Sequence, residues 1–91
     1  MRKVLLSTTE WAEEILAAHV DDISPADVTL ARSLIDDGDG WLAAYDLLGS
    51  GADEGWLTAA EAETALAFAR AGKFGKFSAG AENDARSVLA S

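Results

Sequence analysis

Four positions along this chain carry side chains that typically begin an α-helix. Serine and threonine at such positions accept a hydrogen bond from a backbone N–H group that the first helical turn leaves free. A glutamate three residues later can bond back to the capping residue, and a proline fits the first helical position. The signals therefore predict a chain built from short helices. They are Ser7 with Glu10, Ser24 with Pro25 and Asp27, Thr58 with Glu61, and Ser78.

Two segments repeat an acidic residue, a glycine, a tryptophan and a leucine. They are residues 39–44, DGWLAA, and residues 54–60, EGWLTAA. Acidic side chains are favourable beside the positive end of a helix dipole, so each repeat reads as an acidic turn that leads into a helix. The first repeat predicts a further helix start near Gly40 or Trp41. Large aromatic rings in a short chain are usually part of the core, although tryptophan is also enriched at binding surfaces.

No segment of useful length alternates apolar and polar residues as a half-buried strand does. Apolar residues recur instead at helical spacing. The glycine-rich stretches at 49–52 and 72–75 predict connections between helices. We therefore expect an all-α fold, a compact single-domain bundle of four to five short helices that comprises residues 1–91. The expected helices are residues 8–20, 25–36, 41–48, 59–71 and 79–90.

The apolar residues indicate how these helices pack. In 8–20 one stripe runs from Trp11 to Val20. The helix at 59–71 is rich in alanine and apolar on two sides, which predicts a central position, with Leu66 buried between its neighbours. We expect Phe74 and Phe77 to fill the core from the loop before the last helix.

The charge of the chain is strongly negative and unevenly distributed. The net charge is −9 over 91 residues, and residues 10–63 contain fourteen acidic side chains but one cation, Arg32. Such a surface repels nucleic acid and attracts basic protein surfaces. The leading hypothesis is therefore a non-enzymatic acidic interaction protein that docks on a basic surface of another protein, with no tight nucleic-acid binding of its own. The expected contact residues are Asp36, Asp37, Asp39, Asp53 and Glu54, with Glu13 and Glu14 as a second patch.

Some anti-restriction and anti-CRISPR proteins imitate the charge of nucleic acid in this way. The analogy rests on size and charge alone, since no motif of this chain identifies it with such a family. It extends the hypothesis to an inhibitor of a nucleic-acid-binding complex.

A loop near the carboxyl end supports a different hypothesis. In residues 70–77, RAGKFGKF, cations alternate with aromatic rings. Such a segment can bind phosphates and stack on bases, or bind an acidic partner. The contacts would come from Arg70, Lys73, Phe74 and Lys76. Against it, residues 70–91 contain only four cations, Arg70, Lys73, Lys76 and Arg86, beside a strongly acidic remainder of the chain.

The acidic turns also allow a third hypothesis, a protein that responds to a divalent cation. Aligning Gly40 or Gly55 with the turn glycine of an EF-hand loop places some carboxylates correctly, such as Asp37, Asp39 and Glu61. Each alignment lacks a ligand at the first position, where Ile35 or Ser50 stands. We therefore expect no metal site.

The residues for catalysis are also sparse. His19 is the only histidine, there is no cysteine, and the serines lack the setting of an activated nucleophile. His19 lies near the end of the first helix, where a structural role is the simpler interpretation. We expect no enzymatic activity and no cofactor. The longest apolar run near the start, Val4 to Leu6, is too short for a signal peptide or a membrane span, so we expect a cytoplasmic protein that does not associate with membranes.

Overall fold

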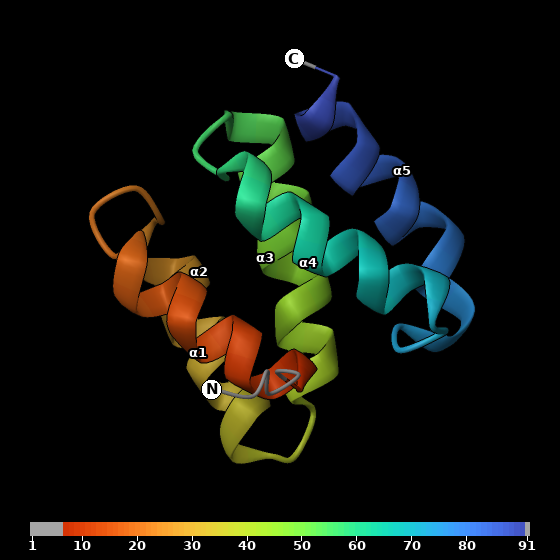
Figure 1. The fold of residues 1–91 in the computed structure, drawn as a ribbon. Helices are drawn as coiled ribbons and strands as arrows, with labels where there is room; N and C mark the ends of the chain where they lie inside the picture. Colours follow the sequence, from red (N-terminus) through yellow and green to blue (C-terminus); the bar gives the residue numbers. More distant parts are fainter. Residues whose placement is uncertain (1–6, 91) are drawn as a thin grey trace, which may run out of the picture.

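The computed structural model describes residues 7–90 and confirms an all-α bundle. Five α-helices and one turn of 3₁₀-helix account for most of these residues, and no strand occurs among them (Figure 1). The helices are α1 (Thr8–Ala18), α2 (Pro25–Asp36), α3 (Gly40–Glu54), α4 (Ala59–Arg70) and α5 (Ser78–Leu89), with the 3₁₀ turn η1 (Gly75–Phe77) directly before α5.

Three of the four predicted caps form as expected. The hydroxyl of Ser7 accepts from the backbone N–H of Glu10, whose carboxylate accepts from the N–H of Ser7 in return. Thr58 and Glu61 make the same reciprocal pair at the start of α4. The Ser24 hydroxyl accepts from the backbone N–H of Asp27 at 3.2 Å. These local signals place the starts of α1, α2 and α4 correctly.

The prediction that Ser78 caps the last helix is wrong. Ser78 already has helical backbone angles, with φ −59° and ψ −38°, because η1 runs straight into α5. A capping residue needs an extended backbone to turn its hydroxyl toward the free N–H groups. The Ser78 hydroxyl is instead buried and has no hydrogen-bond partner among residues 7–90.

Helix α3 is longer than predicted, because residues 49–52 continue the helix rather than forming a connection. Gly51 is buried, and a Cβ atom on it would lie 3.1 Å from Leu57 Cβ and from the Trp56 ring. The glycine therefore lets the segment after α3 fold back against the helix. The helix ends at Gly55, whose φ of 81° is a left-handed conformation that favours glycine.

The central helix is α3, not the alanine-rich α4. Helix α3 packs against α1, α2 and α5, whereas the main neighbour of α4 is α5 (Figure 1). The alanines Ala62, Ala65 and Ala69 form the buried face of α4, and small side chains let two helices approach closely. Leu66 lies beside this face and is half-buried, so the prediction that it is enclosed between helices is also wrong.

The first helix ends earlier than its apolar stripe predicts. Helix α1 stops at Ala18, and His19 leaves helical geometry with φ −122° and ψ 24°. Val20 therefore falls outside the helix and is 52% exposed. The buried core includes Trp11, Ile15 and Leu16 from α1, Leu47 and Leu48 from α3, and Phe74 from the loop before η1.

Candidate functional site

All seven acidic residues predicted as contacts lie on the surface. Glu13 and Glu14 are on α1, Asp36 ends α2, Asp37 and Asp39 lie in the following turn, and Asp53 and Glu54 end α3. None of them forms an ion pair with another residue of the 7–90 range. These carboxylates are therefore solvated and free to meet an external cation.

The structure divides the seven acids into separate groups. Asp39 precedes the first residue of α3, whereas Asp53 lies in its last turn. Asp53 lies fourteen positions after Asp39, which at a rise of 1.5 Å per residue separates them by about 20 Å along the helix. The two acidic turns that look alike in the sequence therefore lie at opposite ends of α3 and do not form one patch.

A shallow cleft between α1 and α2 joins the first group to Glu13. Its lining consists of Glu13, Arg32, Ile35 and Asp36, and its volume is about 170 Å³. Ile35 is half-buried and supplies an apolar wall. The turn residues Asp37 and Asp39 directly follow this cleft along the chain. We call Glu13, Asp36, Asp37 and Asp39 the α1–α2 acidic surface.

Glu14 faces the other side of α1. It lines a second cleft of about 170 Å³, between α1 and α4, together with Trp11, Ile15, Ala60, Glu61 and Thr64. Within this cleft the Thr64 hydroxyl donates to the backbone carbonyl of Ala60 at 3.3 Å.

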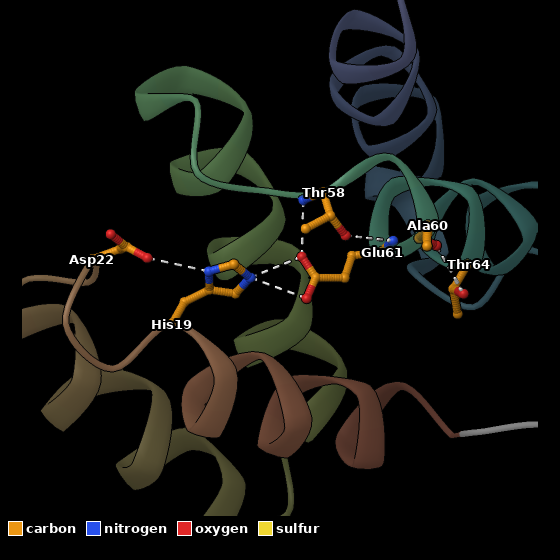
Figure 2. Close-up of polar contacts among 6 residues, drawn as sticks. All are labelled: His19, Asp22, Thr58, Ala60, Glu61 and Thr64. Carbon is orange, nitrogen blue, oxygen red and sulfur yellow. Dashed lines mark hydrogen bonds and ion pairs between the residues drawn. The ribbon is translucent and has the colours of Figure 1, made fainter.

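A polar cluster around His19 adjoins this second cleft (Figure 2). His19 is 8% exposed. Its Nε2 lies 2.8 Å from Glu61 Oε1 and 3.0 Å from Glu61 Oε2, and its Nδ1 lies 3.3 Å from Asp22 Oδ2. The cluster connects the end of α1 with the start of α4.

Glu61 has two roles in this cluster. Its Oε1 accepts a hydrogen bond from the Thr58 backbone N–H at 2.9 Å as part of the capping box. The same carboxylate is hydrogen-bonded to His19 Nε2. Partial burial alone raises the pKa of Glu61, but hydrogen bonds from Thr58 and His19 outweigh burial and hold the pKa below its usual value. The carboxylate therefore stays ionised.

The arrangement around His19 is typical of a structural residue. Both imidazole nitrogens face carboxylates, and Trp56 packs against the ring with centroids 4.7 Å apart and an interplanar angle of 39°. A general base needs a ring nitrogen directed at a substrate or nucleophile. Here the ring nitrogens hold two segments together. Sequence reasoning finds the Thr58–Glu61 box but misses its link to His19, which lies 42 residues away.

The basic loop of the alternative hypothesis presents cations but not the predicted aromatic ring. Phe74 is fully buried, while Arg70, Lys73 and Lys76 are exposed. Arg70 lies 3.7 Å from Glu82, and Lys76 lies over the Phe77 ring at 5.4 Å from its centroid. Phe77 in turn packs on Tyr45 and Trp41. Arg70 and Lys76 thus already have partners within the chain.

The residues proposed for a divalent cation are held apart. Asp37 and Asp39 lie before α3, and Glu61 is engaged by His19 at the start of α4. Across residues 7–90, no group of three histidine, aspartate or glutamate side chains is arranged to hold a metal ion.

Two further carboxylates lie partly buried at the contacts of α3. Burial raises the pKa of Asp46 on α3, and the carboxylate of Asp27 on α2 raises it further. Burial likewise raises the pKa of Asp84 on α5, and Asp53 adds to the effect. Like charges therefore face each other where α3 meets α2 and where it meets α5.

Comparison with protein-family models, with curated proteins and with solved structures found no match. In the part of the chain that the structure describes, no helix is long and apolar enough to cross a membrane.

Proposed function

We propose that this protein is a non-enzymatic docking module whose α1–α2 acidic surface binds a basic surface of another protein. The observation that carries the proposal is the meeting of Glu13 and Asp36 in one cleft, beside the apolar wall of Ile35. Arg32 lines the same cleft but forms no ion pair with Glu13 or Asp36 among residues 7–90, so these exposed carboxylates can attract cationic side chains of a partner, and the apolar wall adds a contact that salt does not screen.

Asp53 and Glu54 have a lesser role in this proposal than the sequence predicts. They lie at the far end of α3, about 20 Å from Asp39, and add to the overall field rather than to the same contact. The partner class that fits best is a nucleic-acid-binding protein, because its binding site presents cations to a polyanion. In that setting the module would act as an inhibitor by occupying the nucleic-acid site.

A defined basic probe tests the docking surface. Fluorescein-labelled decalysine should bind the protein, and raising the salt concentration should weaken the complex. Neutralising the α1–α2 acidic surface, as Glu13→Gln, Asp36→Asn, Asp37→Asn and Asp39→Asn together, should weaken binding by about tenfold or more, as several charge contacts are lost.

A control variant with the same net charge as the α1–α2 variant distinguishes binding at a local surface from attraction by the overall negative charge. It combines Asp21→Asn, Asp53→Asn, Glu54→Gln and Glu63→Gln, which neutralise four exposed acids elsewhere on the molecule. We expect this control to weaken decalysine binding several-fold less. Equal losses in the two variants would leave only net charge as the cause and would exclude a docking surface at α1–α2.

The inhibitor form of the proposal has its own measurement. A labelled DNA duplex held by decalysine should be released when the protein is added, because the protein competes for the same cations. The variant of the α1–α2 acidic surface should release less duplex than the charge-matched control at the same concentration. Failure of the unaltered protein to displace DNA would exclude mimicry of nucleic acid.

A further inference from the structure

Helix α2 is the least buried of the five α-helices. Ala31 is its one buried residue, whereas each of the other four buries two or more. It packs mainly on α3 and makes a smaller contact with α1. Leu30 of α2 is 47% exposed, and Val20 is the only other large apolar side chain that is exposed among residues 7–90. One side of α2 therefore has no partner in the described part of the chain.

This uncovered side combines two leucines with two carboxylates. Leu30 and the half-buried Leu34 lie one turn apart. Asp27 comes three positions before Leu30, and Asp37 comes three positions after Leu34. Residues three and four apart share a helix face, so the leucines lie between the two carboxylates, which are about 15 Å apart along the helix. We call these four residues the outer face of α2.

The charges favour a cation at each end of the outer face. Neither Asp27 nor Asp37 forms an ion pair within residues 7–90. Burial raises the pKa of Asp46 on α3, and the charge of Asp27 raises it further, so a cation beside Asp27 would relieve a repulsion that the fold leaves unbalanced. Arg32 is the only cation of α2. It lines the α1–α2 cleft and points away from Leu30, two positions before it on the helix.

The outer face is continuous with the α1–α2 acidic surface, because Asp37 belongs to both. A partner bound at that surface can therefore extend along α2. An amphipathic helix fits this face, since its apolar residues recur every three or four positions, as Leu30 and Leu34 do. Cations in its outer turns can reach two carboxylates about 15 Å apart, which is the rise of about ten helical residues.

We propose that the outer face of α2 binds a basic amphipathic helix of the partner, with apolar side chains on Leu30 and Leu34 and cations at Asp27 and Asp37. The inference rests on the proposed function and names the element of the partner that docks. Such a helix covers apolar surface that decalysine leaves exposed to water, so its binding depends on Leu30 and that of decalysine does not.

The probe is a fluorescein-labelled lysine–leucine peptide with leucine at helical spacing, compared with a scrambled peptide of the same composition. The amphipathic peptide should bind more tightly. Leu30→Ser should weaken its binding by about three-fold or more and leave decalysine binding unchanged. The matched control is Val20→Ser, which removes the other exposed apolar side chain from the turn after α1 and should change neither. The peptide should also shift the Leu30 and Leu34 methyl resonances of the unaltered protein.

Three results would overturn the inference. Equal losses in Leu30→Ser and Val20→Ser would mean that the peptide adheres to any exposed apolar side chain. Equal binding of the scrambled peptide would remove recognition of a helix. Unchanged Leu30 and Leu34 methyl resonances at saturation would leave the outer face empty, and this measurement needs no variant to fold. The proposed function is tested separately, by decalysine and the α1–α2 variant, so its failure is distinct from failure here.

Discussion

The backbone of Gly40, the first residue of α3, lies directly against the side chain of Thr9 in α1. A Cβ atom at position 40 would overlap Thr9 Oγ1 and would lie 2.6 Å from Thr9 Cβ. Gly40 is buried at this crossing. Glycine is therefore required at position 40 because two helices approach closely there, and not because the chain turns.

Gly40→Ala should destabilise the fold by about 3 kcal/mol or more, because an added methyl group can be accommodated only by moving α1 or α3. Urea denaturation followed by circular dichroism measures the loss. A second change, Thr9→Gly, should recover part of the stability by opening the same space. A Gly40→Ala protein as stable as the original would show that the two helices can separate at little cost.

Gly49 and Gly51, both in the second half of α3, should respond in opposite ways to alanine. At Gly49 the nearest atom to an added Cβ is Asp84 Oδ2 at 3.6 Å, an ordinary contact, so the better helix propensity of alanine should stabilise by up to about 1 kcal/mol. At Gly51 the added atom meets Leu57 and Trp56 at 3.1 Å, and a loss of about 1–3 kcal/mol is expected. Thermal unfolding of both variants gives the comparison, and the same sign for both would contradict it.

The half-buried position of Leu66 lowers the expected cost of truncating it. Leu47→Ala removes a fully buried side chain from α3 and should cost about 2–5 kcal/mol. Leu66→Ala should cost about half as much or less, because part of that side chain already contacts water. Chemical denaturation measures both losses of stability. A larger loss for Leu66→Ala than for Leu47→Ala would indicate that α4, rather than α3, lies at the centre of the core.

Glu61→Gln tests the link between His19 and the start of α4. Glutamine can still cap the helix, so the change removes mainly the charge, and we expect a loss of about 1 kcal/mol at neutral pH. Because the pKa of Glu61 is lower in the folded chain than its usual 4.5, this stabilisation is complete above that value and disappears as the pH falls through the folded pKa. The two proteins should therefore differ at about pH 7 and converge toward about pH 3. Glu63→Gln, exposed on the same helix, should change stability by less than about 0.5 kcal/mol at either pH.

Asp84→Asn should act in the opposite direction. Burial and Asp53 raise the pKa of Asp84, so its ionised form destabilises the folded chain, and this penalty is relieved as the pH falls from above the folded pKa to below the usual 3.8. The variant should gain up to about 1 kcal/mol at neutral pH and nothing at about pH 3, because the group is only partly buried. Asp21→Asn, at an exposed turn, corrects for the change in net charge. A loss of stability in Asp84→Asn would mean that the carboxylate makes a favourable contact.

Sequence reasoning succeeds here where a structure depends on neighbours in the chain. The boxes at Ser7 and Thr58 need residues three positions apart, and both form. It fails where a distant contact decides. Gly51 predicts a helix end from the sequence, but in the structure it is a close contact inside α3 with Trp56 and Leu57. The partner of His19 is Glu61, which lies on a different helix, 42 residues away. The exposure of the seven acids follows from their polarity, whereas the separation of Asp39 from Asp53 depends on the unexpected length of α3.

Helix α3 packs against α1 and α2 and also against α5. These shared contacts limit where the chain tolerates a break. A cut inside α3 would divide the helix against which α1, α2 and α5 all pack. A cut in the exposed turn at 20–22 would leave α3 whole and remove only α1. Two fragments should therefore reassemble when the break is at that turn, but not when it is within α3. Because α3 contacts helices on both sides of it in the sequence, the bundle should unfold as one cooperative unit rather than as two separable pairs of helices.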